Sequence, residues 1–223
     1  MKYQNNQVRE KILMEFEKSL GESGYKKTTI QQIASICGIS KGHVTFYFKK
    51  KEDFLFALFE NFFARMSILM EEVKLEGNPI ILFFVKQLFT FYLLDKKEDY
   101  CKKVSELSEV KAMMDFRTKI FYNDISSIFK QMNIKFDSNL LEDTCVTLSC
   151  TIYGLINYWY HKSYRKNYKY FFNIFADHFF AQNNFDNLKH NKERALELFE
   201  SLDKIKLLEM YNELFEYNYI KLK

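Results

Sequence analysis

The sequence contains very little proline and glycine, with one Pro and six Gly among 223 residues. These two residue types most often end helices and form turns, so the chain has few positions at which a long helix must break. We therefore expect an almost entirely α-helical protein. Apolar residues make up 48% of the sequence and charged residues 28%. This balance is typical of a globular protein and unlike that of a disordered chain.

Cysteine is scarce as well, and the four cysteines do not have the spacing of metal ligands. They are Cys37, Cys101, Cys145 and Cys150. Such residues are typical of reduced thiols in the cytosol, with a redox-sensing role as the alternative. The N-terminal segment MKYQNNQVREK is polar throughout, so no signal peptide is predicted. We expect a cytoplasmic protein.

Segments that could enter a membrane are also missing. The most apolar segment, 80–94, reads IILFFVKQLFTFYLL and includes Lys86 and Gln87. A helix that spans a bilayer needs about 20 predominantly apolar residues. The segment is therefore predicted to be a buried helix, and no membrane partner is expected.

Motifs of the common enzyme classes are absent. The sequence contains no E-x-x-H or H-E-x-x-H pair and no Gly-rich phosphate loop. The spelling G-x-S-x-G occurs in GISKG at 38–42, but without the strand-to-helix elbow that the hydrolase motif requires. Its four histidines are scattered. Asp177 and His178 are adjacent, so their side chains would point apart on a helix. We expect no catalytic activity, no metal site and no cofactor.

Charge is distributed unevenly along the chain. Residues 1–51 contain ten basic and four acidic residues, for a net charge of +6. The other 172 residues contain 23 basic and 25 acidic residues, for a net charge of −2. A basic segment joined to a nearly neutral one indicates a polyanionic partner for the basic segment alone. The alternative is a basic surface that only faces solvent.

The basic segment is predicted to form three helices. Apolar residues repeat with helical spacing across 7–20, and the sequence GESGY ends that helix. Thr28 is expected to cap a second helix, with Gln31 completing a capping box. Gly38 would close the second helix, and Ser40 would cap a third. Two short helices joined by a tight glycine-containing turn form a helix-turn-helix.

The third helix would present its first turns to DNA. Lys41, His43 and Thr45 lie where a recognition helix meets base edges, and the turn that begins at Ser40 would direct N–H groups at a phosphate. Further along, Tyr47 and Lys51 are placed to contact the DNA backbone. Phe46 and Phe48 are predicted to be core residues, which would turn the phenylalanines inward and the tyrosine outward.

The stretch 28–55, TTIQQIASICGISKGHVTFYFKKKEDFL, resembles the DNA-binding segment of the TetR/AcrR family of bacterial transcriptional regulators. The matching features are the Thr-Thr start, the Ile-Ala pair, Gly-Ile-Ser-Lys-Gly, Phe48, and Lys51 followed by an acidic residue and a leucine. The resemblance covers about residues 7–60. Thr45 departs from it, because members usually have at this position a tyrosine that contacts the DNA backbone. A threonine can donate one hydrogen bond, over a shorter reach.

The resemblance implies a set of DNA-contacting residues. Thr29 and Gln31 match positions that meet phosphates or bases, although both could instead only cap the second helix. Lys41, Gly42 and His43 match the base-reading turn, with simple exposure as the alternative for His43. Tyr47 and Lys51 match phosphate contacts. Ser40 and Thr45 complete the predicted set.

The remaining chain is expected to be a larger all-α domain. Amphipathic or apolar patterns predict helices at about 51–76, 80–94, 101–110, 112–132, 144–160 and 167–182. Residues 184–223 form a C-terminal appendage with one or two further helices. The predicted organisation is a helix-turn-helix DNA-binding domain at 1–50, followed by a helical effector-binding and dimerisation domain at 51–223.

A homodimer is expected for a physical reason and from the resemblance. One short recognition helix reads too few base pairs for useful specificity. In the resembled family, the helices that correspond to 144–160 and 167–182 pack with their counterparts into a four-helix interface. This predicts that the interface contains Leu148, Ile152, Leu155, Phe171, Phe175 and Phe179.

The larger domain is rich in aromatic residues, which would line a pocket for a small effector. The predicted lining is Phe84, Phe116, Tyr122, Tyr153 and Trp159, with ordinary core packing as the alternative for each. Basic residues do not cluster in these segments, which argues against a highly anionic effector. We predict a hydrophobic or aromatic, weakly charged ligand. The resemblance implies a ligand-responsive repressor on a palindromic double-stranded operator; the alternative is a DNA-binding interaction protein that a protein partner controls.

Overall fold

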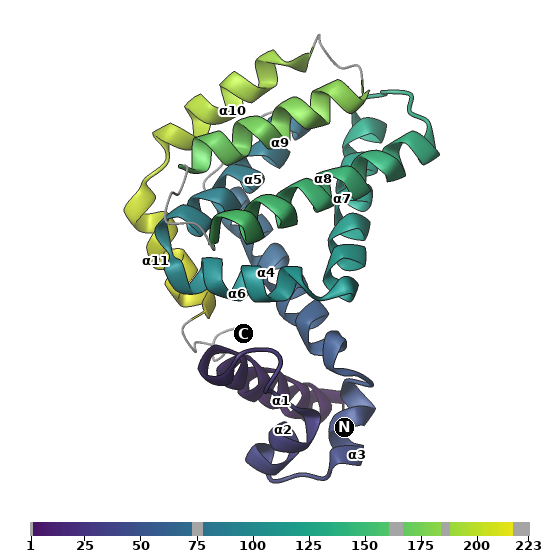
Figure 1. Ribbon diagram of the computed structural model, residues 1–223, viewed down its shortest axis with the longest axis vertical. Helices are drawn as coiled ribbons and strands as arrows, with labels where there is room; N and C mark the ends of the chain where they lie inside the picture. The colour runs from purple at the N-terminus through teal and green to yellow at the C-terminus, as the bar shows by residue number, and fades with distance from the viewer. Residues whose placement is uncertain (1, 73–77, 161–166, 184–187, 216–223) are drawn as a thin grey trace. The chain divides into compact units, whose positions relative to one another are not determined.

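The computed structural model describes residues 2–72, 78–160, 167–183 and 188–215 (Figure 1). Helices account for the regular structure of these residues, and none of them forms a strand. The predicted all-α class is therefore confirmed. Residues 73–76 of the helix predicted at 51–76, and 184–187 and 216–223 of the appendage, lie outside the described residues.

The chain divides into two compact units. The head unit comprises Met1–Ser67 and Ile205–Lys223, and the body unit comprises Ile68–Lys204. The helix α4 (Lys51–Glu72) begins in the first unit and ends in the second. The sequence analysis divided the chain by function, into a DNA-binding domain at 1–50 and an effector-binding and dimerisation domain at 51–223, and this division stays a prediction.

The head unit packs the long helix α1 (Lys2–Ser23) against α2 (Ile30–Cys37), and α2 against α3 (Lys41–Tyr47). Its core is a stack of three phenylalanine rings. The ring of Phe54 lies 4.4 Å from that of Phe16 and 4.1 Å from that of Phe48, measured between centroids. All three side chains are fully buried or nearly so. Phe48 is therefore a core residue, as predicted.

The start of α2 differs from the prediction by one residue. Thr29 is the N-cap, and its Oγ1 accepts a hydrogen bond from the Gln32 backbone N–H. The Gln32 side chain in turn accepts from the Thr29 backbone N–H, so the capping box is Thr29 with Gln32 and not Thr28 with Gln31. Thr28 is buried, and its hydroxyl donates to the Gly24 carbonyl at 2.9 Å. The hydrogen bond of Thr28 to the end of α1 thus leaves Thr29 as the residue that caps α2.

The turn between α2 and α3 forms as its sequence predicts. Gly38 has a φ of 69°, in the left-handed region that favours glycine, and it closes α2. Ser40 follows as the N-cap of α3, and its Oγ accepts a hydrogen bond from the His43 N–H at 3.1 Å. These two residues fix the direction in which α3 leaves α2.

The body unit is built around α5 (Pro79–Lys96), which packs against α6 (Glu98–Ser108), α7 (Lys111–Gln131), α9 (Tyr168–Asn183) and α10 (His190–Ser201). Asn78 caps α5 through a hydrogen bond from the Ile80 N–H, and Pro79 occupies its first position. A further helix, α8 (Ser138–Tyr160), packs against α6, α7 and α9. Among the helices described, none is long and apolar enough to cross a bilayer.

The appendage contains two helices, α10 and α11 (Lys204–Phe215), in agreement with the sequence analysis. The fully buried ring of Phe199 in α10 lies 5.8 Å from those of Tyr92 in α5 and Tyr168 in α9. These contacts make α10 part of the body core.

Candidate nucleic-acid interface

Four of the predicted DNA-binding residues form the exposed first turn of the head unit's third helix. Ser40, Lys41, Gly42 and His43 are all exposed. A Cβ added at Gly42 would meet only the Ser40 Oγ, at 3.8 Å. The turn is therefore free of covering protein within the described part of the chain, and its smallest residue leaves room for another molecule to approach.

A pair of stacked rings joins the first turn of α3 to the second. His43 and Tyr47, four residues apart, have ring centroids 5.7 Å apart and planes inclined by 24°. Tyr47 is half-buried, so its ring supports the exposed imidazole of His43. The structure brings these two predicted contact residues onto one face.

Phe46 is not a core residue, and that prediction is wrong. Its side chain is 71% exposed. Val44 and Phe48, four residues apart, form the buried face of α3, and Phe46 lies about 200° around the helix from Val44. Its ring packs edge-on against Tyr47 at 5.1 Å. Sequence analysis missed this exposed apolar group on the recognition helix, although the helical spacing contained the signal.

Two other predicted contact residues make hydrogen bonds within the head unit. The Thr45 hydroxyl donates to the Gly42 carbonyl at 3.0 Å and is half-buried. Lys51 donates from its Nζ to the Tyr25 carbonyl, and the same Nζ lies 3.9 Å from the centroid of the Tyr25 ring. Burial lowers the pKa of Lys51, and the Glu52 carboxylate opposes that shift. Lys51 therefore ties the loop before α2 to the start of α4.

Two lysines outside the predicted set of DNA-binding residues lie at the surface. Lys49 and Lys50 lie between α3 and α4 and are exposed. The Lys50 backbone N–H donates to Asp53 Oδ2 at 3.0 Å, which fixes the backbone here and leaves the side chain at the surface. Together with Lys41, they place three exposed ammonium groups on or next to α3.

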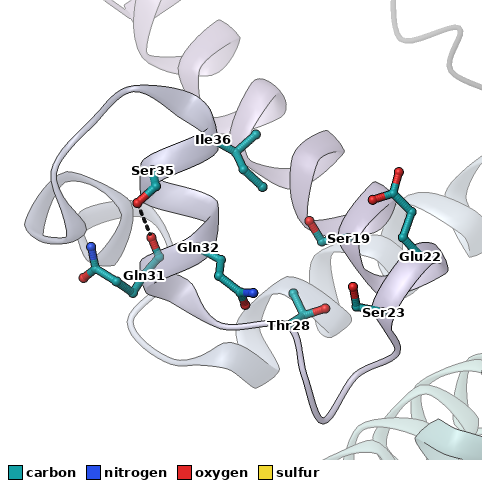
Figure 2. A pocket seen from close by; sticks show the side chains of 8 residues that line it. All are labelled: Ser19, Glu22, Ser23, Thr28, Gln31, Gln32, Ser35 and Ile36. Carbon is teal, nitrogen blue, oxygen red and sulfur yellow. Dashed lines mark hydrogen bonds between the residues drawn. The ribbon is translucent and has the colours of Figure 1, made fainter.

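The remaining predicted residues, Thr29 and Gln31, are exposed at the start of α2. Thr29 caps the helix, while the Gln31 carbonyl accepts a hydrogen bond from the Ser35 hydroxyl. Gln31 also borders an open groove of about 420 Å³ between α1 and α2 (Figure 2). The groove is lined by Ser19, Glu22, Ser23, Thr28, Gln31, Gln32, Ser35 and Ile36. The carboxylate of Glu22 disfavours a phosphate there, which leaves α3 as the better site for DNA.

The four predicted effector-binding residues whose side chains are described take different positions in the body unit. Phe84 is fully buried among the rings of α9. Tyr122 borders a different feature, an open groove of about 440 Å³ whose other lining residues are Met114, Asp115, Thr118, Lys119, Glu142 and Val146. Phe116 is half-buried, and Tyr153 is buried with its hydroxyl donating to the Met113 carbonyl at 3.3 Å. The side chain of Trp159 lies outside what the structure describes.

The predicted dimer residues face the interior of a single body unit. Leu148, Ile152, Phe171, Phe175 and Phe179 are buried, and Leu155 is half-buried. These five side chains are packed within one chain, and their role in a dimer interface stays a prediction. The outward face of α8 instead carries Val146, Cys150, Gly154 and Tyr158, which are exposed and spaced four residues apart.

Sequence comparison identifies relatives of the head unit. The family described as "Bacterial regulatory proteins, tetR family" matches residues 15–58. Two curated relatives come from Bacillus subtilis (strain 168), both described as uncharacterized HTH-type transcriptional regulators. YerO is 36% identical over 76 residues, which are 33% of this chain and 26% of YerO. YuxN is 29% identical over 101 residues, which are 44% of this chain and 35% of YuxN.

Structural comparison extends the likeness to the body. Thermus thermophilus FadR, described as a TetR family transcriptional repressor in complex with lauroyl-CoA, superposes with a TM-score of 0.52. The match covers 88% of this chain and 96% of FadR at 14% identity, so it bears on the fold alone. The family match covers the end of α1, all of α2 and α3, and the start of α4, and so includes the exposed turn of α3. Over this segment the chain is similar to the tetR family of bacterial regulatory proteins, and the segment contains the helix-turn-helix formed by α2 and α3.

Proposed function

We propose that the chain is a ligand-responsive repressor that binds a palindromic DNA operator as a homodimer in the cytoplasm and has no enzymatic activity. The observation that best supports this function is the exposed turn Ser40–His43 at the start of α3, which lies in a segment with a net charge of +6. An exposed recognition turn in a basic three-helix unit matches the requirements of major-groove binding. FadR, which shares the fold, is described as bound to lauroyl-CoA. We assign the effector site to the body.

Base reading is assigned to Lys41 and His43, with Phe46 as an apolar contact for a thymine methyl group. Phosphate contacts are assigned to Lys49 and Lys50, because their side chains are exposed beside α3. Tyr47 supports the ring of His43. A ligand that favours one conformation of the body would then shift the spacing of the two recognition helices and release the operator.

Replacing Lys41 or His43 by alanine should change which operator sequence is preferred. Each lost base contact is expected to reduce discrimination at its base pair by ~1–3 kcal/mol. Selection from a random duplex library, first with the wild-type chain and then with each variant, measures this preference. The Lys49→Ala variant serves as the control and should weaken all duplexes alike. If all three variants keep the wild-type preference, Lys41 and His43 contact only phosphates.

Replacing Gly154 by arginine should dissociate the dimer without unfolding the chain. A Cβ at this exposed position meets no atom within 4 Å, so a single chain accommodates the side chain. Glycine in a helix is also about 1 kcal/mol less favourable than alanine. In a dimer formed through the outward face of α8, the arginine would separate the two helices.

Light scattering during size-exclusion chromatography measures the mass of the particle. The wild-type chain should show twice the chain mass of 27.0 kDa, and Gly154→Arg should show the mass of one chain. Ser127→Arg, at an exposed position of α7, is the matched control and should remain a dimer. A dimeric Gly154→Arg variant would place the interface elsewhere.

A further inference from the structure

Arg117 carries a positive charge into the interior of the body unit. Its side chain in α7 is 6% exposed, and it is the one charged residue in the buried class among the residues described. Its Nε and Nη2 have no hydrogen-bond partner in the described part of the chain. No described carboxylate forms an ion pair with it either. Buried N–H donors of a charged group that have no acceptor are unfavourable, so this site is incomplete.

Aromatic rings surround the guanidinium. Its central carbon lies 4.9 Å from the ring centroid of Phe121 in α7 and 5.7 Å from that of Tyr153 in α8. Tyr100 in α6 is buried; burial raises its pKa, and the positive charge of Arg117 opposes that shift. Arg117 therefore lies where α6, α7 and α8 meet. Ring faces stabilise a cation but supply no acceptor for its N–H groups.

The two unpaired donors are placed to bind one group together. Nε and Nη2 lie on the same edge of the planar guanidinium, so their N–H bonds are nearly parallel. The two oxygens of a carboxylate match such a pair, and this bidentate arrangement is the strongest form of arginine recognition. The Tyr153 hydroxyl donates to the Met113 carbonyl at 3.3 Å, and its oxygen accepts a hydrogen bond from Arg117; burial raises the pKa of Tyr153, and this hydrogen bond opposes that shift. Nε and Nη2 are still the two Arg117 donors without a partner.

We propose that the body unit binds a monocarboxylate with an apolar body, and that Arg117 holds the carboxylate through Nε and Nη2. One buried cation matches one negative charge, and the rings of Phe121 and Tyr153 match an aliphatic or aromatic chain. This assignment rests on the proposed ligand-responsive function and names its ligand class. It also refines the weakly charged ligand predicted from the sequence, where no basic cluster was visible and a lone arginine gave no signal.

Thermal melting of the full-length protein tests the class of ligand. The probes are hexanoate, dodecanoate and phenylacetate, each paired with its alcohol: hexanol, dodecanol and 2-phenylethanol. At least one carboxylate should raise the melting temperature in a concentration-dependent manner, while its alcohol should have at least tenfold weaker affinity by calorimetry. Equal effects of acid and alcohol, or no effect of any acid, would overturn the proposal.

Variants test the residue. Arg117→Lys keeps the charge and loses the paired donors, whereas Arg117→Met removes the charge at similar length. Both substitutions should lower the affinity for the responding carboxylate at least tenfold. The control Lys119→Met, at an exposed position of the same helix, should bind it with unchanged affinity. A folded Arg117→Met variant that keeps wild-type affinity would refute the role.

A measurement on the wild-type protein avoids the folding question. The ¹⁵N-labelled Nε–H signal of Arg117 should move downfield when the responding carboxylate is added and stay in place with its alcohol. DNA binding is recorded in the same samples. DNA binding without any carboxylate response would overturn the Arg117 site and leave the DNA-binding function. A carboxylate that binds Arg117 and does not change DNA affinity would support the site and refute the ligand-responsive function.

Discussion

Raising the salt concentration from 50 to 200 mM is expected to weaken binding of duplex DNA by about 10³-fold or more. The reason is the release of counterions when lysines neutralise phosphates. Each recognition helix has three exposed lysines on it or next to it, namely Lys41, Lys49 and Lys50. Two heads in a dimer would bring six ammonium groups, of which Lys49 and Lys50 contact phosphates and Lys41 displaces counterions from within the groove. Neutralising about six phosphate charges produces a loss of this size. Fluorescence anisotropy of a labelled duplex measures the affinity at each salt concentration.

Lysine variants separate phosphate contacts from structural contacts. Lys50→Ala removes one phosphate contact from each head of the dimer, so it should reduce the slope of log affinity against log salt by about 2. Lys51→Ala should leave the slope unchanged and lower the melting temperature of the head, because its ammonium bonds the Tyr25 carbonyl. A reduced slope for Lys51→Ala would restore the phosphate contact that the sequence resemblance predicts. A salt-independent affinity would contradict DNA binding through these lysines altogether.

Local signals in the sequence are enough to predict most of the helix boundaries. Asn78 and Pro79 begin α5 because a side-chain cap and a proline are both favoured there. Ser40 begins α3 for the same reason, and Gly38 closes α2 through its left-handed conformation. The exposed turn Ser40–His43 follows from these boundaries, so this part of the candidate site is predictable from local sequence.

Errors arise where two equivalent residues compete and a distant contact decides between them. Thr28 and Thr29 are both good caps, and the choice depends on the hydrogen bond from Thr28 to the Gly24 carbonyl. Phe46 and Phe48 are chemically identical, and only the direction of the buried face of α3 separates them. The residue types alone do not show that Thr28 lies near the Gly24 carbonyl, and they do not show which face of α3 is buried.

Contacts between helices of the body are still harder to predict. The segment that forms α5 is apolar on all sides, which correctly indicates a buried helix. This pattern does not show which rings of α9 it meets, so pocket and core assignments could not be separated. Arg117 is missed for the same reason, because its burial depends on Tyr153 and Phe121 being near each other in space.

Replacing Phe84 by alanine is expected to destabilise the body by about 3–5 kcal/mol, as for other fully buried phenylalanines. Its side chain is 0% exposed, and the ring centroids of Phe172, Phe179 and Phe180 lie 5.4–5.6 Å from its own. Removing the ring would leave a cavity that these neighbours fill only partly. Urea denaturation followed by circular dichroism measures the loss of stability.

The same substitution at Phe46 is the control. Its ring is 71% exposed, so Phe46→Ala should change the stability by no more than about 0.5 kcal/mol. The sequence analysis placed Phe84 in the effector pocket, and the experiment distinguishes the two roles. A pocket residue would tolerate truncation at a cost of about 1 kcal/mol or less and would alter ligand binding. A core residue would lose most of its stabilising contacts whether or not a ligand is present, and the packing of Phe84 among three rings of α9 favours this result.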